Sequence, residues 1–451
     1  MAESGSMLFD FRARKVRIHD LRAAVEPMNI SRDRSIALLR RAQGYSLAAC
    51  ALSLPLQSVL IVPGIDLTLT KIAGAMLVLL VIIEYPLSLR WLLPRIGIES
   101  ATVLALGAAA LSLPASVLPK ESITSLLIFA QYAVICYACA HVAMRRDAQT
   151  MLPRYLACGA AISGAGAVLA WFHVLVTPTV DALVPGSAIR RVCFGMPDAN
   201  EQAMVFVFVL ALLLFSTSHR AYLSIKIASI LLIAAGLLLT MSRTGWVCAA
   251  IVIAMRCFAH ERRKVIVPMS LGVVVVCAIG VALMKPDIAD SIWRRIAEAT
   301  SAGDRSIASR VLYNVQAIET AENAGAFGYG VGAVYHVTKD FADPLGRTVG
   351  VTVHNVPLTV WIEAGWVGLL AYLWLWSSVA AVLFVAWRRA HDPQEKLRMA
   401  GYCVVATSYA IFSQTMPFLQ RSSLAILLGC ALGAAAIAVN TSIKEDGVVE
   451  A

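Results

Sequence analysis

Long apolar runs recur along the whole 451-residue chain and constrain its fold more than any other feature. A helix needs about 20 apolar residues to cross a bilayer core of about 30 Å. Runs of roughly this length lie at 44–62, 67–84, 98–118, 122–143, 155–176, 203–218, 221–240, 244–258, 265–284, 355–386, 399–415 and 422–440. The sequence therefore predicts an all-α polytopic membrane protein with about twelve transmembrane helices.

The overall composition excludes the two commonest alternatives to a membrane protein. Hydrophobic residues make up 59% of the chain and charged residues only 15%, whereas a soluble domain carries about 25% charged residues. A disordered chain is excluded because such chains are poor in apolar residues. Residues 1–43 are polar, so we expect no cleavable signal peptide before the first apolar run.

The net charge of +10 predicts how the chain is oriented in its membrane. It arises from 38 Lys and Arg residues against 28 Asp and Glu residues. Basic residues are dense before the first span, and cytoplasmic loops of membrane proteins carry such an excess. If the N-terminal end lies in the cytoplasm, most of the basic residues fall on the cytoplasmic side of the membrane. We therefore expect both termini in the cytoplasm and no nucleic-acid partner.

Two connections are too long to be simple turns between spans. The larger has mixed helical spacing at 287–300 and 305–323, followed by closely spaced glycines from Gly325 to Gly332, and long loops in compact proteins are usually functional. The predicted organisation is a basic cytoplasmic segment at 1–43, spans one to nine at 44–284 with an outer loop at 177–202, a large outer loop at 285–354, spans ten to twelve at 355–441, and a cytoplasmic tail at 442–451.

The strongest local motif lies where the large loop returns to the membrane. His354 and Asn355 are followed, after nine further residues, by Gly365 and Gly368. The imidazole, with an ordinary pKa of about 6.5, suits proton transfer near neutral pH, and Asn355 would hold a sugar or fix the local backbone. Pro357 suits a first helical turn, and the two glycines permit a close helix contact. The alternative is a histidine that caps a helix or lines the interface.

Arginines on the same side of the membrane form the second candidate feature. Arg243 lies between two apolar spans, Arg190 and Arg191 lie in the 177–202 loop, and Arg310 lies in the helical part of the large loop. A guanidinium keeps its charge and binds phosphate through two parallel hydrogen bonds. Snorkelling to lipid headgroups would explain any single one of them. Together with a histidine, they predict a phosphate-binding site with a base.

The chain lacks the motifs of nucleotide- and metal-dependent enzymes. It contains no P-loop, no Gly-x-Ser-x-Gly and no His-Glu-x-x-His. The acidic residues of the large loop include no Asp-x-Asp pair that would hold a divalent ion between phosphates. Gly328, Gly330 and Gly332 read as a loop rather than a nucleotide site. We therefore expect no metal and no cofactor, and we expect the bound phosphate to belong to a lipid.

These motifs together resemble the O-antigen ligases, within the O-antigen ligase/polymerase superfamily of bacterial envelope glycosyltransferases. The resemblance rests on the many spans, on the long loop that ends in His-Asn-x9-Gly-x-x-Gly, and on Arg243 within Ser-Arg-Thr-Gly. It implies a GT-C-like, metal-independent enzyme of the Gram-negative inner membrane, with its site facing the periplasm. His354 would be the catalytic histidine, and the donor pyrophosphate would bind Arg191, Arg243 and Arg310, with Arg190 and Asn355 as auxiliary residues.

The resemblance also implies a reaction and its substrates. O-antigen polysaccharide would be transferred, with inversion, from undecaprenyl pyrophosphate to lipid A–core oligosaccharide, in contact with membrane lipids. Within the same superfamily, the alternatives are an O-antigen polymerase and a protein O-oligosaccharyltransferase. From another class, a flippase or transporter of polyprenyl-linked saccharides would also need arginines but would not need a base. The absence of an evident internal repeat weakens the transporter interpretation.

Overall fold

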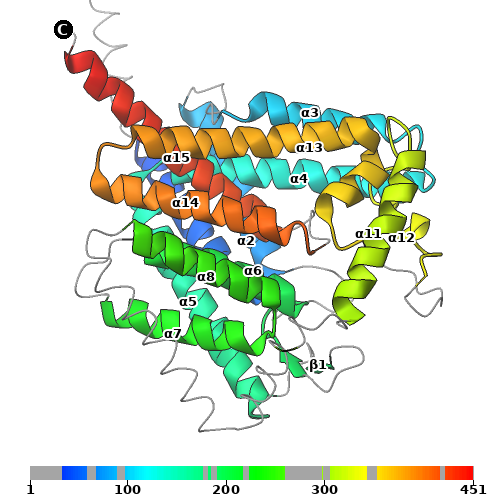
Figure 1. Cartoon of the computed structure of the whole chain (residues 1–451). Helices are drawn as coiled ribbons and strands as arrows, with labels where there is room; N and C mark the ends of the chain where they lie inside the picture. The colour runs from blue at the N-terminus through cyan, green and yellow to red at the C-terminus, as the bar shows by residue number, and fades with distance from the viewer. Residues whose placement is uncertain are drawn as a thin grey trace, which may run out of the picture.

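The computed structural model describes residues 33–57, 68–88, 97–175, 181–183, 190–216, 223–259, 297, 305–342, 353–416 and 422–449, and these residues are mostly helical (Figure 1). The N-terminal helix covers 33–53 and continues into the short 3-10 helix η1 (Leu54–Leu56). The further elements are α2 (Leu69–Ser88), α3 (Glu99–Leu111), α4 (Pro119–Ala143), α5 (Arg146–Trp171), β1 (Asp181–Leu183), β2 (Arg190–Val192), α6 (Ala199–Leu214), α7 (Leu223–Leu239), α8 (Arg243–Phe258), α11 (Arg305–Asn323), α12 (Val334–Val337), α13 (Val356–Arg389), α14 (Pro393–Phe412) and α15 (Ser422–Val449).

The helices follow the apolar runs of the sequence. Every predicted run falls on a helix except 265–284, which lies outside the described residues. Of the described helices, five are long and apolar enough to cross a membrane, at Leu69–Pro86, Pro119–Ala143, Arg146–Trp171, Val356–Arg389 and Ser423–Asn440. Helices α3, α6 and α7 are apolar but shorter. The described part of the chain is therefore that of a polytopic helical membrane protein.

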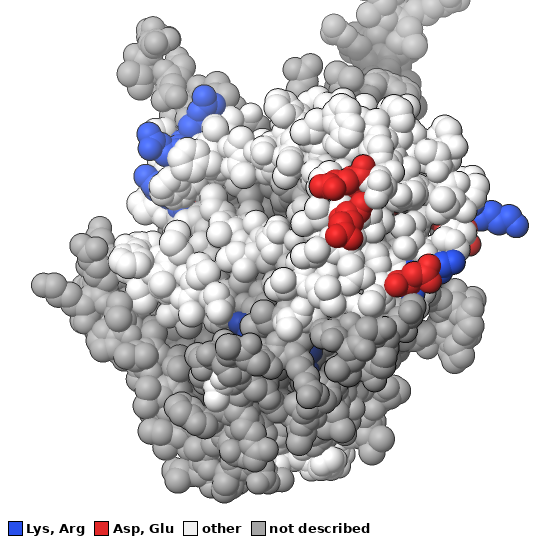
Figure 2. Space-filling model, turned by 45° about the vertical axis from the view of Figure 1, so that its right-hand side comes forward, with Lys and Arg blue, Asp and Glu red and all other residues white. Residues whose placement is uncertain are grey.

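The surface of these helices is apolar in a way that suits lipid. Ile82, Val103, Leu127, Leu370 and Trp374 are each about half exposed or more, although a soluble protein rarely exposes wide apolar patches. Charged side chains are sparse over the described part of the face shown in Figure 2. An apolar exterior is what a bilayer requires of a protein that spans it.

Helix α6 forms the centre of the bundle. Nearly all of its residues are buried, and α5, α7, α8 and α14 surround it. Glycines allow the close approach of these helices, because a Cβ on Gly164 of α5 would overlap the Leu232 carbonyl of α7. Such contacts between small residues are usual between membrane helices. The rigid packing fixes where the N-terminus of α6 lies.

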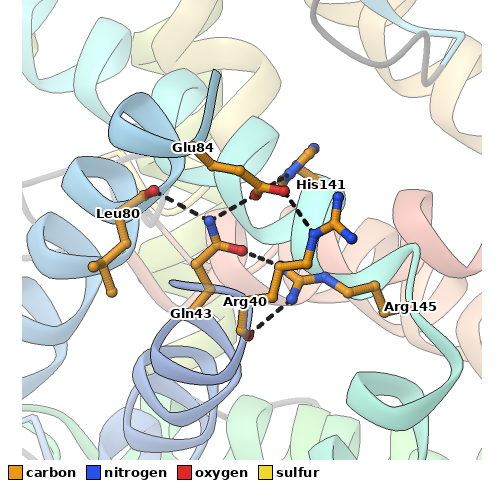
Figure 3. Close-up of polar contacts among 6 residues, drawn as sticks. All are labelled: Arg40, Gln43, Leu80, Glu84, His141 and Arg145. Atoms are coloured by element: carbon orange, nitrogen blue, oxygen red, sulfur yellow. Dashed lines mark hydrogen bonds and ion pairs between the residues drawn. The ribbon is translucent and has the colours of Figure 1, made fainter. Parts of the chain in front are cut away.

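A polar cluster around the buried carboxylate of Glu84 joins the N-terminal helix to α2 and α4 (Figure 3). The Glu84 carboxylate accepts hydrogen bonds from Arg40 Nε at 2.8 Å and Gln43 Nε2 at 2.8 Å, and His141 Nε2 lies 3.1 Å away. Arg145 donates to the Arg40 carbonyl at 2.8 Å and to the Gln43 side chain. A carboxylate inside an apolar helix is costly unless it is paired. This cluster therefore fixes the relative positions of the three helices.

The run at 355–386 does not form the single continuous helix that its length predicts, because α13 breaks at Gly365. The backbone of Gly365 has φ 66° and ψ −171°. Residues 324–333, here called the glycine loop, dock into this break. Tyr329 N–H donates to the Ile362 carbonyl at 2.9 Å, and Gly330 N–H donates to the Glu363 carbonyl at 2.8 Å. The Gly-x-x-Gly motif therefore serves loop docking rather than only helix packing.

Three further sequence predictions meet the structure in the connections. The helix predicted at 305–323 is confirmed as α11, whereas 287–300 lies outside the described residues apart from residue 297. The predicted run at 98–118 ends early, since α3 stops at Leu111 and the following turn contacts the glycine loop. The purely α-helical prediction is wrong for the 177–202 loop, where β1 and β2 pair antiparallel.

Candidate active site

The predicted site residues lie on elements that meet at one end of the bundle. Helices α11 and α12 and the β1–β2 ribbon gather at this end, and the C-terminus lies at the other (Figure 1). Arg191, Arg243, Arg310 and His354 are all intermediate in exposure, so each side chain is partly covered. A charged ligand that approaches from outside the bilayer would reach partly covered charges of this kind at the end of an apolar bundle.

Arg191 is held in place by two hydrogen bonds from its guanidinium. Its Nε donates to the Thr240 carbonyl at 2.9 Å, and one terminal nitrogen donates to Asn200 Oδ1 at 2.6 Å. Arg190 precedes it on β2, but its side chain lies outside the part of the chain that the structure describes. The two hydrogen bonds place Arg191 beside the start of α6 and the end of α7.

The N-terminus of α6 supplies the partner of Arg191. Asp198 is the N-cap, and its Oδ1 accepts from Asn200 N–H at 2.7 Å and Glu201 N–H at 3.2 Å. The preceding loop is fastened by Gln202, whose Oε1 accepts from Phe194 N–H at 2.7 Å. An aspartate cap satisfies helix N–H groups that have no partner within the helix. The cap and the fastened loop thus keep Asn200 at a fixed position.

Arg243 is the first residue of α8 and follows a strained turn. Met241 is fully buried and has φ 51°, a conformation that costs a residue with a side chain about 1 to 3 kcal/mol. Ser242 then caps α8 by accepting from Gly245 N–H at 3.3 Å. The strain and the cap together determine where α8 starts, and hence where Arg243 lies. Neighbouring Thr244 donates to the Thr415 hydroxyl at 3.3 Å, which joins this turn to the end of α14.

His354 precedes α13 but does not cap it. The N-cap is Asn355, whose Oδ1 accepts from Leu358 N–H at 3.0 Å, as expected for a residue that fixes the local backbone. Asn355 Nδ2 also donates to Gln414 Oε1 at 3.3 Å, and Val356 N–H donates to the Ser413 carbonyl at 2.7 Å. Residues 413–415 therefore contact both the start of α13 and the start of α8. The side chain of His354 is therefore not used to cap α13.

The electrostatic surroundings of His354 favour its neutral form. Burial lowers the pKa of His354 below its ordinary value, and the positive charge of Arg310 lowers it further. The negative charge of Asp198 acts in the opposite direction on this pKa. These influences show that the charges of Arg310 and Asp198 both lie near the imidazole. A neutral imidazole near pH 7 can accept a proton, which a general base requires.

Arg310 reaches this environment because α11 packs on the start of α13. Ala317 and Ala321 of α11 are buried against Ile362 of α13, together with Val353 and Phe341. Arg310 lies two turns before Ala317 on the same helix. The apolar contact thus explains why an arginine from the large loop lies near His354.

An apolar cavity of about 190 Å³ lies between α3, α4, α13 and α15. Its lining includes Phe129, Tyr132, Tyr372 and Trp376, and Val331 of the glycine loop closes part of it. Glu363 also borders the cavity, but its Oε1 accepts from Val334 N–H at 3.3 Å and so fastens α12. Space of this kind suits an apolar chain rather than a polar ligand.

The structure adds residues that the sequence motifs did not single out. Asp198, Asn200 and Thr240 contact or influence the predicted residues, although none belongs to a recognised motif. An aspartate directly before an apolar helical run is an N-cap signal, so Asp198 could have been anticipated, whereas Thr240 could not. Across the described residues, no group of three or more His, Cys, Asp or Glu side chains gathers as a metal site would require.

Comparison with known proteins identifies one family. Residues 227–373 match the family model described as O-antigen ligase, and the matched stretch is about a third of the chain. It contains Arg243, Arg310 and His354 but not Arg191. No curated protein sequence matches the chain. The resemblance to O-antigen ligases drawn from the sequence is therefore confirmed over this stretch, and members of that family are glycosyltransferase-like enzymes.

Proposed function

We propose that this chain, in which residues 227–373 are of the O-antigen ligase type, is itself an O-antigen ligase. It moves O-antigen polysaccharide from undecaprenyl pyrophosphate to lipid A–core oligosaccharide. The observation that carries the proposal is that the elements bearing the four predicted residues gather at one end of the bundle (Figure 1), where Arg310 influences a partly buried His354.

The proposed topology places this end of the bundle at the periplasmic face of a Gram-negative inner membrane. About twelve spans in a GT-C-like arrangement, with residues 1–43 and 442–451 in the cytoplasm, bring the loops at 177–202 and 285–354 to that face. The large number of basic residues before the first span supports this orientation, since such residues stay in the cytoplasm. The apolar cavity beside α13 supports a substrate with a lipid chain.

In the proposed mechanism, His354 acts as the general base. A hydroxyl oxygen of the acceptor sugar attacks the anomeric carbon of the donor, and His354 takes the proton of that hydroxyl. The bond between the anomeric carbon and the phosphate oxygen breaks at the same time. One displacement of this kind inverts the anomeric carbon, and a well-placed base contributes about 10²- to 10⁴-fold in rate.

The arginines act on the leaving group. Undecaprenyl pyrophosphate gains negative charge as its bond to the sugar breaks, and Arg191, Arg243 and Arg310 would stabilise that charge. Fixed cations in a partly dry site stabilise developing charge more strongly than water does, because they need no reorientation. The two hydrogen bonds that hold Arg191 support such fixed orientation. No metal or cofactor has a part in the proposed reaction.

A lipopolysaccharide profile in a deletion strain tests the proposal against its alternatives. Loss of a ligase leaves core without O-antigen while lipid-linked polymer accumulates. Loss of a polymerase leaves core that bears one repeat unit, and loss of a flippase keeps the unmodified unit on the inner side. Loss of a protein O-oligosaccharyltransferase would leave the lipopolysaccharide profile unchanged and would abolish glycosylation of a protein. Any profile except the first would reject the ligase assignment.

A further inference from the structure

Two cations from neighbouring helices meet at the C-terminal end of α6. Lys226 of α7 donates from Nζ to the Ser216 carbonyl at 2.7 Å. Arg256 of α8 donates from Nε to the Leu214 carbonyl, also at 2.7 Å. These two acceptors are only two residues apart, so their Cα atoms lie within about 7 Å of each other. The positive charge of Arg256 accordingly acts on Lys226, and the end of α6 holds two positive charges side by side.

Capping of α6 accounts for only part of this charge. The last carbonyl groups of a helix have no partner within the helix, and basic side chains often bind them. The negative end of a helix dipole is equivalent to about half an elementary charge, whereas Lys226 and Arg256 bring two. Among the residues that the structure describes, neither cation forms an ion pair with a carboxylate. In sequence, the adjoining segments 217–222 and 259–264 carry four basic residues and one acidic residue, so they add to the positive charge rather than balance it.

Both side chains keep hydrogen-bond donors that a phosphate can accept. A guanidinium has five N–H groups and an ammonium has three, and each cation uses one of them on α6. Within the described part of the chain, no residue accepts from the terminal nitrogens of Arg256. Its Cζ atom lies 5.9 Å from the ring centroid of the buried Phe215, a cation–π contact that helps to hold the guanidinium in place. A phosphate at this end of α6 would therefore meet donors that are already positioned.

Exposed apolar side chains flank the two cations in the chain. Leu223, Ile225 and Ile227 of α7 are each about half exposed, and Phe258 of α8 is 75% exposed. In a membrane protein such side chains face the acyl chains of lipids, whereas basic residues at the ends of spans reach the headgroups. Basic pockets between membrane helices bind the headgroups of anionic lipids. The end of α6 therefore offers one surface for a headgroup and an adjoining surface for acyl chains.

We propose that Lys226 and Arg256 bind the phosphate of an anionic phospholipid at the end of α6 that lies away from the candidate active site. The acyl chains of this lipid lie along the apolar surface of α7 and α8. In the proposed topology, the lipid belongs to the cytoplasmic leaflet. The 16 residues of α6 span about 24 Å, so this site is separate from the one near Asp198. The inference requires only that the chain spans a membrane, and not that it is a ligase.

The experiment measures binding of dioleoylphosphatidylglycerol to the full-length protein, purified in detergent, by native mass spectrometry. The variants are Lys226→Gln, Arg256→Gln and the double variant, because glutamine removes the charge but can still donate to a carbonyl. Lys396→Gln is the matched control, since Lys396 also lies over an aromatic ring, 5.9 Å from the Trp387 centroid, but directly follows the acidic Glu395. Dioleoylphosphatidylcholine, whose phosphate is balanced by a choline cation, is the control lipid. Thermal unfolding of every variant shows whether the fold is kept.

The expected affinities follow from the two charges. The wild type should bind the anionic lipid more tightly than the zwitterionic one. Each single substitution should weaken binding of the anionic lipid about fivefold, the factor that one basic residue contributes at an anionic membrane surface, and the double variant about 25-fold. Lys396→Gln should leave both affinities unchanged. Inorganic phosphate at the same concentration as the lipid should not displace it, because a free anion lacks the acyl chains that contact α7 and α8.

Several results would overturn the proposal. Equal affinity of the wild type for the two lipids would reject an anionic-lipid site, and so would a double variant that binds like Lys396→Gln. Displacement of the lipid by inorganic phosphate would show a site for a small anion and would reject a phospholipid as its occupant. Should Arg256→Gln fail to fold, Lys226→Gln decides alone, because the partly exposed Ser216 can bind water in place of the ammonium.

Discussion

Replacement of Gly365 by alanine should detach the glycine loop from α13. Two separate effects oppose a side chain at this position. The backbone angles of φ 66° and ψ −171° lie in a region that essentially only glycine adopts. In addition, a Cβ would overlap the backbone carbonyl of Ala326, which cannot move aside without moving the loop.

The expected cost can be assembled from these two effects. The conformational strain contributes about 1 to 3 kcal/mol. Displacement of the loop would also break the bonds from Tyr329 N–H, Gly330 N–H and Val367 N–H, at about 1 kcal/mol each or somewhat less. Docking of the loop is therefore weakened by about 3 to 6 kcal/mol. Since 1.4 kcal/mol corresponds to a tenfold change, the loop opens about 10² to 10⁴ times more often.

Amide hydrogen exchange measures this opening directly. Exchange at Tyr329 and Gly330 should accelerate by that factor in Gly365→Ala, whereas buried amides of α6 keep their protection. Gly325→Ala is the matched control, because Gly325 also has positive φ, 67°, but its Cβ would meet no atom within 4 Å. It should cost only about 1 to 2 kcal/mol. Equal exchange in Gly365→Ala and the wild type would refute the account of the broken helix.

Three further predictions follow from the charges. The rate of transfer should fall as pH drops through the pKa of His354, so the midpoint of that fall lies below about 6.5; Arg310→Gln, which removes a positive charge, should move the midpoint up, and Asp198→Asn should move it down. If neither substitution moves the midpoint, His354 is excluded as the titrating group. Glu84→Ala should lower the free energy of unfolding by about 1 to 3 kcal/mol in a denaturant titration, because the buried Gln43 and the partly buried His141 lose their acceptor. Arg243→Lys should reduce transfer at least tenfold, since lysine offers a point charge rather than a fork, and wild-type turnover would indicate snorkelling instead.

The features that could be predicted from the sequence are those that depend on residues close together in the chain. Apolar runs predict helices because every residue of a span lies in the bilayer. The mixed spacing of 305–323 predicted α11 with the bounds that the structure shows. Arg243 stood out because a cation beside an apolar run is costly. His354 and Arg310 stood out because an imidazole suits proton transfer and a guanidinium suits phosphate binding, and both lie in the large outer loop. Each of these signals is contained within about twenty consecutive residues.

Contacts between distant segments explain what could not be predicted. Glu84 lies 44 residues from Arg40 and 57 from His141, and no local pattern indicates their pairing. The break at Gly365 depends on a loop that docks from residues 324–333, so the run around it still reads as one helix. Arg191 donates to Asn200 only because β2 folds back beside α6. These are properties of the packed chain rather than of any one segment.

The most direct test of the proposed function is transfer by the purified protein in lipid vesicles. The substrates are undecaprenyl pyrophosphate-linked O-antigen and lipid A–core, and the product is the joined lipopolysaccharide seen on a gel. We expect the wild type to form this product, and His354→Ala to lose about 10²- to 10⁴-fold in rate while it still binds farnesyl pyrophosphate, a short polyprenyl pyrophosphate. Turnover at the wild-type rate in His354→Ala would contradict the account.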